Sequence, residues 1–165
     1  MPDFWMDADS FIEPYRGPYR FETLPQFWDF LKQKAEEGII ASPELLLEKE
    51  LTADDPKDSD ALEKWAMPLK GIMFLGADES VQACYREIVQ YVQSNSIYKP
   101  HWVTKFLDGV DPWVIAYAKA HGGRVVTFEK PQPEAKKPKI PDVAKHFKVK
   151  CITVYDMLAE LKVKF

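Results

Sequence analysis

The sequence predicts an α/β fold: three layers, α/β/α, around a central and mostly parallel sheet. Short apolar runs typical of strands alternate with longer segments of helical periodicity, which favours parallel strands with helices on both faces. Residues 111–129 show one helix–strand unit in full. Asp111 and Pro112 suit the N-cap and the first helical position, and a glycine pair separates the helix from an apolar run at 124–128. We expect residues 1–165 to form a single domain.

The first part of the chain supplies two expected strands and two expected helices. Residues 4–7 are an apolar run cut off by acids, so we expect a strand that ends in an aspartate. Apolar residues at helical spacing predict a helix over 24–37, and the glycine that follows ends it. Residues 38–41 are the second expected strand. A serine and a proline then begin a helix over 42–51.

The other elements follow from the same signals. Apolar runs predict strands, capping residues and prolines predict helix starts, and stretches rich in proline, lysine or acids predict loops. In chain order we expect a loop at 13–23, an acidic loop at 52–58, a helix at 61–67, a strand at 72–75, a long helix capped by Asp78, a helix from Pro100, a mobile loop at 130–141, a helix from Pro141, a strand at 150–154 and a helix at 155–161.

Composition favours a soluble globular protein. Of the 165 residues, 46% are hydrophobic and 29% charged, which is enough for a sizeable core. Cys84 and Cys151 lie far apart without metal-ligand spacing, so we expect free thiols in a reducing compartment. No apolar run approaches the ~18 residues of a membrane span, and no basic-then-apolar leader follows Met1. We therefore expect no membrane partner and a cytoplasmic location.

The net charge of -4 is unevenly distributed. Residues 130–165 hold nine lysines against four acids, a balance of +5, so residues 1–129 carry -9. An acidic body beside a basic segment would suit a metal site next to a polyanion. Ordinary solvated lysines explain the same asymmetry equally well.

Four acids are candidates for one site. Asp7 ends the first strand, Asp111 begins a helix, Glu129 follows a strand, and Glu50 lies beside the apolar face of its helix. The carboxyl ends of parallel strands share one edge of a sheet, so these side chains can border one crevice. Each acid also has an ordinary explanation as a helix cap, a turn residue, a salt-bridge partner or a loop acid. Either Glu44 or Glu48 could take the inward place of Glu50.

A cluster of this kind has a specific chemistry. Carboxylates that converge repel one another unless cations lie between them, and oxygen-only ligands select Mg²⁺ or Mn²⁺, ions that serve phosphate chemistry. Cysteine and histidine form no zinc motif, because the histidines at 101, 121 and 146 are scattered. The sequence has no glycine-rich phosphate loop and no local signature of a nucleophilic serine or cysteine.

Four motifs together resemble the PIN-domain superfamily, closest to a PIN-like branch of bacterial and archaeal proteins. Phe-Trp-Met-Asp7-Ala-Asp-Ser is similar to the opening strand of that family, and Glu50 before a leucine to its second acid. Asp111-Pro-Trp-Val-Ile-Ala-Tyr-Ala resembles the helix headed by its third acid. Val-Val-Thr-Phe-Glu129 resembles its Val-Thr-x-Asp motif, with glutamate in place of the usual aspartate. The likeness runs in order through nearly the whole chain.

This resemblance implies a metal-dependent ribonuclease, often the toxin of a toxin–antitoxin pair. Mg²⁺ or Mn²⁺ would be held by Asp7, Asp111 and Glu50, with Glu129 in a second or outer position. Ser10 and Thr127 would hydrogen-bond to the ligands, and Asp9 and Asp142 are less certain neighbours. The candidate contacts to RNA phosphates are Arg16, Arg20, Lys130, Lys136, Lys137 and Lys139.

Two other functions remain open. Asp7 and Asp9 after an apolar strand also resemble the nucleophile and acid of haloacid-dehalogenase-type phosphatases, with Lys130 as a candidate lysine. The Asp108–Asp111 segment opens a helix instead of ending a strand, which counts against that family. The second alternative is a PIN-like interaction module without catalysis.

The expected partners are an RNA substrate, an antitoxin protein and a second copy of the chain. Aromatic residues are concentrated at 12–30, and Tyr15 and Tyr19 lie in a segment that could contact an antitoxin. Packing of this segment on its own domain, or a homodimer contact, is the competing explanation.

Overall fold

A five-stranded parallel sheet organises the molecule. The computed structural model describes residues 2–165. The strands β1 (Phe4–Met6), β2 (Ile40–Pro43), β3 (Phe74–Leu75), β4 (Arg124–Val126) and β5 (Cys151–Ile152) lie in the order β3-β2-β1-β4-β5. Every strand pair is parallel, with Phe4 opposite Ile40 on one side of β1 and opposite Arg124 on the other. All three residues of β1 are buried, as its central position requires.

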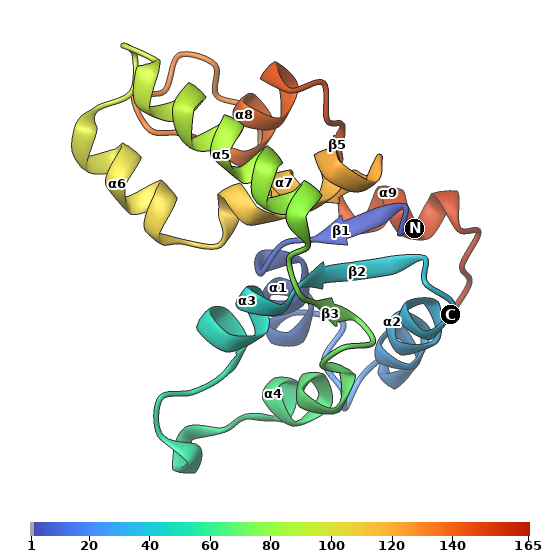
Figure 1. The fold of residues 1–165 in the computed structure, drawn as a ribbon. Helices are drawn as coiled ribbons and strands as arrows, with labels where there is room; N and C mark the ends of the chain where they lie inside the picture. Colours follow the sequence, from blue (N-terminus) through green and yellow to red (C-terminus); the bar gives the residue numbers. More distant parts are fainter. Residues whose placement is uncertain (1) are drawn as a thin grey trace.

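Helices cover both faces of the sheet and complete a three-layer α/β/α fold. In Figure 1, α5, α7 and α8 lie on one side of the strands, and α1, α2 and α4 on the other. The helical segments are α1 (Asp9–Arg16), α2 (Pro25–Glu36), α3 (Glu44–Leu46), the π-helical turn η1 (Leu47–Leu51), the 3-10 turn η2 (Pro56–Asp58), α4 (Ala61–Ala66), the 3-10 turn η3 (Met67–Leu69), α5 (Glu79–Ser94), α6 (Pro100–Asp108), α7 (Asp111–His121), α8 (Ile140–His146) and α9 (Val154–Glu160).

The strand order creates a crevice beside β1. The chain builds β1, β2 and β3 toward one edge and then places β4 and β5 on the opposite side of β1. In open α/β sheets, the carboxyl ends of the two strands at such a reversal flank a gap that binds ligands. Here those strands are β1 and β4, whose residues Met6 and Val126 are paired. Residues just after them therefore face one another.

The structure confirms the expected fold class and most elements. Asp78 caps α5 by accepting a hydrogen bond from the Val81 amide at 2.8 Å, and Gly38 follows α2 with a φ of 76°. One helix was missed: residues 9–16 form α1, so the expected loop at 13–23 begins later. Pro14 lies inside this helix, where its missing N–H removes a backbone hydrogen bond, and it is buried together with Phe11.

Two helix starts were placed wrongly. Asp111 is the first residue of α7 and not its N-cap, which is Val110. Ser42 belongs to β2, and its buried hydroxyl donates a 2.8 Å hydrogen bond to the Met6 carbonyl instead of capping a helix. The helix that follows begins at Glu44 and becomes a π-helical turn at Leu47. The strand β2 therefore ends two residues later than expected, and the Ser42 side chain links it to β1.

The aromatic segment at 12–30 and the 130–141 loop both pack on the body of the protein. Tyr15 makes edge contacts with Phe21 and Trp28, and the Trp28 indole donates to the Tyr19 carbonyl at 2.6 Å. The aromatic segment thus packs on its own domain, as the competing explanation held. The 130–141 loop is anchored where the Lys99 amide donates to the Lys136 carbonyl at 2.9 Å. This hydrogen bond restrains the 130–141 loop, which we expected to be mobile.

Helix length and polarity also bear on the membrane prediction. Within residues 2–165, no helix has both the length and the apolar character needed to cross a membrane.

Both cysteines, Cys84 and Cys151, are free thiols and half-buried.

Candidate functional site

Asp7 is the most deeply buried acid of the crevice. It directly follows β1, its side chain is 3% exposed, and its amide donates to the Val126 carbonyl of β4 at 3.0 Å. Its Oδ2 accepts a hydrogen bond of 2.6 Å from the Thr127 hydroxyl, and its Oδ1 accepts one of 3.0 Å from the Ser10 amide. Burial raises the pKa of Asp7 to about 7, although these hydrogen bonds act in the opposite direction.

The Ser10 hydroxyl has two neighbours that compete for its proton. Its Oγ lies 2.9 Å from Oδ1 of Asp7 and 2.8 Å from the Val126 carbonyl. A hydroxyl has one proton to donate, so it cannot satisfy an ionised carboxylate and a carbonyl together. A protonated Asp7 resolves the conflict, because it can donate to Oγ while Ser10 donates to Val126. This geometry agrees with the raised pKa of Asp7.

Asp111 approaches the same point from the other direction. Helix α7 leads into β4, so its first turn lies at the carboxyl edge of the sheet. Burial first, and then the negative charges of Glu129, Asp7 and Glu50, raise the pKa of Asp111 to about 7. Hydrogen bonds offset part of the rise for Asp7, whereas for Asp111 all the main causes raise the pKa. Such a half-buried carboxylate would be stabilised by a cation.

Glu129 and Glu50 complete the acidic wall. Together with Asp111 they line one cavity of about 230 Å³. Glu129 follows β4, and its Oε2 accepts a 3.1 Å hydrogen bond from the Ile140 amide at the start of α8. Burial raises the pKa of Glu129. Glu50 lies on η1, after the carboxyl end of β2, and is exposed instead of resting beside the apolar core as we expected.

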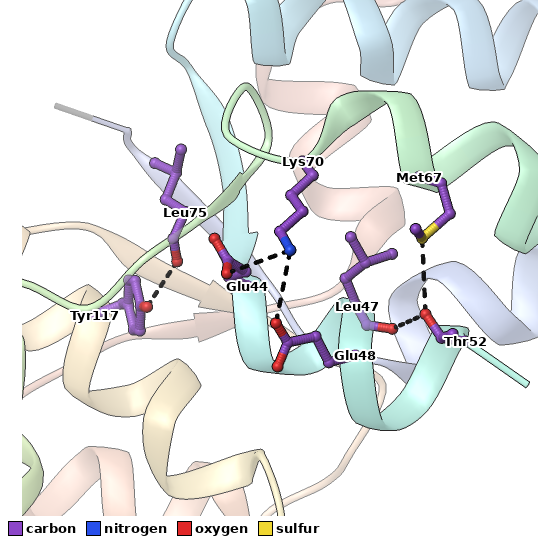
Figure 2. Close-up of polar contacts among 8 residues, drawn as sticks. All are labelled: Glu44, Leu47, Glu48, Thr52, Met67, Lys70, Leu75 and Tyr117. Atoms are coloured by element: carbon purple, nitrogen blue, oxygen red, sulfur yellow. Dashed lines mark hydrogen bonds and ion pairs between the residues drawn. The ribbon is translucent and has the colours of Figure 1, made fainter. Parts of the chain in front are cut away.

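The alternatives to Glu50 point away from this cavity. Figure 2 shows Glu44 and Glu48 turned toward Lys70, whose Nζ lies 3.8 Å from Glu44 Oε1 and 3.9 Å from Glu48 Oε1. Near them the Tyr117 hydroxyl donates to the Leu75 carbonyl at 2.7 Å and holds α7 against β3. Neither Glu44 nor Glu48 therefore takes the inward place, and Glu50 is the acid that lines the crevice.

The four acids share a neighbourhood but not a closed ligand shell. Within residues 2–165, no three His, Cys, Asp or Glu side chains are grouped tightly enough to hold a metal ion as they stand. Like charges repel, and Asp7 and Glu129 are each turned toward hydrogen-bond donors of the protein. The donor chemistry still fits Mg²⁺ or Mn²⁺, since all four groups offer carboxylate oxygens and Asp111 is half-buried beside like charges.

Less certain acids occupy other places. Asp9 is exposed at the start of α1, and its charge contributes to the raised pKa values of Asp7, Asp111 and Glu129. Asp142 on α8 accepts a 2.8 Å hydrogen bond from the Gln132 amide, so its contact in the structure is with the 130–141 loop.

A basic and aromatic rim, not predicted as a unit, faces the acids across the cavity. Trp102, Lys105 and Lys137 line the same cavity as Asp111. The Nζ atoms of Lys105 and Lys137 lie 5.5 and 4.9 Å from the centre of the Trp102 ring. Trp102 and Lys105 were missed, although their spacing on the helix from Pro100 places them on one face. Only the fold shows that this face meets the 130–141 loop.

The other predicted phosphate contacts are dispersed. Lys139 is close enough to Glu129 to lower its pKa, which opposes the effect of burial. Arg20 donates from Nε to the Gly17 carbonyl at 3.0 Å, after the end of α1. The remaining candidates are exposed and do not line the acidic cavity: Arg16, Lys130 and Lys136.

Comparison with known proteins identifies a family. The model of the family described as "Domain of unknown function (DUF4411)" matches residues 4–165. No curated protein and no solved structure matches the chain. The family match spans every acid of the crevice and its basic rim.

Proposed function

The chain belongs to the DUF4411 family, and from this premise and the geometry of the crevice we propose that it is a metal-dependent ribonuclease of the PIN type. One observation carries the proposal: Asp7, which is buried, and Asp111, which is half-buried, are carboxyl groups at the β1–β4 reversal, and Asp111 lines one cavity with Lys105 and Lys137. Burial is the main reason that the pKa of both carboxyl groups rises to about 7. Raised carboxyl pKa values at a ligand-binding edge are typical of functional sites. The resemblance in the sequence motifs supports the same class.

The residues of the crevice would hold a metal ion, orient its ligands and bind the RNA phosphates. Asp7, Asp111 and Glu50 would hold Mg²⁺ or Mn²⁺, with Glu129 on the outer side. An ion held by these residues would supply a Lewis acid for activating water and stabilising the charge of the transition state. Ser10 and Thr127 fix the orientation of the Asp7 carboxylate through their hydrogen bonds. Lys105 and Lys137 bind the phosphates of the RNA strand beside the acids.

We also propose two protein partners for a ribonuclease of this kind. A nuclease toxin in the cytoplasm needs a neutralising antitoxin, and a homodimer is a second proposal. Because Tyr15 and Tyr19 pack on aromatic residues of their own domain, neither tyrosine supports an antitoxin surface by itself.

Cleavage of a fluorescent single-stranded RNA by the purified protein tests the proposal. We expect cleavage with Mg²⁺ or Mn²⁺, none in EDTA, and none from Asp111→Asn with the fold intact by circular dichroism. Glu48→Gln is the matched control, because Glu48 is an exposed acid that pairs with Lys70 outside the crevice.

Three outcomes would contradict the proposal. Undiminished cleavage in EDTA, or by Asp111→Asn, rules out the carboxylate-held metal. Turnover of p-nitrophenyl phosphate without RNA cleavage favours the phosphatase alternative with Asp7 and Asp9. RNA binding without any hydrolysis favours the non-catalytic interaction module.

A further inference from the structure

A second cavity adjoins the acidic crevice at the carboxyl ends of β4 and β5. It has a volume of about 410 Å³, within the range of small-molecule sites. Thr127 and Glu129 line its inner end, and Glu129 also lines the acidic cavity. The two cavities therefore adjoin at Glu129, and Thr127, whose hydroxyl bonds to Asp7, lines the second one.

The walls of this groove combine apolar and aromatic surfaces. Pro131, Pro141 and Ile152 supply aliphatic surface, and Phe128 and Tyr155 supply rings. The two ring centres are 5.5 Å apart with the planes tilted by 56°. Tyr155 is one of the most exposed large hydrophobic side chains in the described part of the chain, at 56%. An exposed ring in a groove offers a stacking surface for a flat ligand.

The polar groups of the groove suit a nucleotide better than an apolar ligand. Lys130 provides a cation at the lining, and Thr153 and Asp156 provide a hydroxyl and a carboxylate. Thr153 and Asp156 are fixed by a reciprocal capping box at the start of α9, with 3.1 Å bonds in each direction. Groups held this rigidly can read the edge of a base through their remaining hydrogen-bonding capacity.

The thiol in the groove does not indicate covalent chemistry. Burial first, and then the charges of Asp7 and Glu129, raise the pKa of Cys151 to about 12. The thiol is therefore neutral at physiological pH and contributes apolar surface.

We propose that this groove binds one unpaired base of the RNA strand whose phosphodiester lies in the acidic crevice, with Tyr155 as the stacking residue. The inference rests on the proposed function and adds to it a base-binding subsite. A single strand fits because its bases are free to turn outward, whereas the bases of a duplex are stacked and paired. Glu129 lines both cavities, which places the bound base next to the reacting phosphate.

An abasic scan tests the groove. The probe is fluorescein-labelled octauridylate, together with a set in which each member lacks one base, and binding is followed by anisotropy in EDTA. With the wild-type protein, we expect one position whose base removal lowers affinity about 5- to 100-fold, the range of a base–aromatic stack. Tyr155→Ala should lower affinity for the intact strand by a similar factor and abolish the effect of that position. Tyr155→Phe should restore both.

Ile97→Ala is the matched control, because Ile97 is 52% exposed and does not line the groove. It should leave the scan unchanged. Wild-type binding with no base-sensitive position, or a sensitive position that persists in Tyr155→Ala, overturns the subsite while leaving the ribonuclease proposal intact. A wild-type protein that neither binds nor cleaves RNA overturns both.

Discussion

The hydroxyl of Thr127 donates a 2.6 Å hydrogen bond to Oδ2 of Asp7, and so joins the carboxyl ends of β4 and β1. The same oxygen of Thr127 accepts a 3.1 Å hydrogen bond from the Glu129 amide. One side chain thus positions an acid of the first strand and the backbone that carries another acid.

Thr127→Val should weaken the site and the fold together at alkaline pH. The valine keeps the shape but removes the donor, so the pKa of Asp7 should rise above its present value of about 7. At pH 8 the buried carboxylate then loses a partner, and we expect a loss of about 1–2 kcal/mol in the free energy of unfolding. At pH 5, where Asp7 is protonated, the loss should be smaller.

Urea denaturation of the metal-free protein at both pH values measures this effect. Thr104→Val is the control, since the Thr104 hydroxyl donates to the Pro100 carbonyl at 3.2 Å on an exposed helix surface. Equal stability of Thr127→Val and wild type at pH 8 would show that the hydrogen bond has no energetic role.

Asp111→Asn should stabilise the metal-free protein at pH 8. The folded-state pKa of Asp111 is raised from 3.8 to about 7, so the folded state binds this proton more tightly than the unfolded state. Its contribution to stability is full below pH 3.8 and is lost as the pH rises through about 7. A neutral amide escapes that loss, and we expect a gain of about 1–3 kcal/mol at pH 8 that disappears near pH 4.

Asp78→Asn provides a contrast for the same experiment. The pKa of Asp78 is lowered by hydrogen bonds from Ser80 and Val81, so its carboxylate stabilises the protein above its unfolded pKa. This variant should lose stability at pH 8 instead of gaining it. If Asp111→Asn also loses stability at pH 8, the burial and repulsion inferred for Asp111 are wrong.

The sequence predicted the elements well because their signals are local. The apolar run before Asp7 and the glycines after α7 specify a strand and a helix end through neighbouring residues alone. The helix at 9–16 was missed because Pro14 indicated a break, while the burial of Phe11 and Pro14 against the domain favours the helix. Tertiary packing outweighed the local preference in this segment.

The site was predictable only in part. Asp7, Ser10 and Thr127 come together, as expected from the resemblance of the sequence motifs, since parallel strands bring their ends to one edge. The basic rim was not predictable, because it depends on the contact between the Lys99 amide and the Lys136 carbonyl. Nor does sequence spacing show that Glu129 bonds to the Ile140 amide. Such contacts depend on how distant loops pack, and no periodicity encodes them.

Gly123→Ala should destabilise the protein through the strand that carries Asp7. A Cβ at this position would lie 2.8 Å from the Trp5 ring and 2.9 Å from the Pro2 carbonyl oxygen. Trp5 is fully buried in β1 and cannot move aside, so we expect a cost of about 1–3 kcal/mol from overpacking. Thermal melts give the comparison. Gly76→Ala is the control, because its Cβ would meet nothing within 4 Å, and a melting temperature equal to wild type for both variants would contradict the packing argument.

Lys105→Gln and Lys137→Gln should weaken RNA binding in a salt-dependent way. Both ammonium groups lie beside the Trp102 ring at the rim of the acidic cavity, so each is placed to neutralise a phosphate of a bound strand. Removing one such contact should lower the slope of log affinity against log salt by about 0.7 for a single strand. The measurement is anisotropy of a labelled RNA at several salt concentrations. Lys32→Gln, an exposed lysine on α2, should leave the slope unchanged. Slopes for both rim variants that equal the wild-type slope would place the RNA elsewhere on the protein.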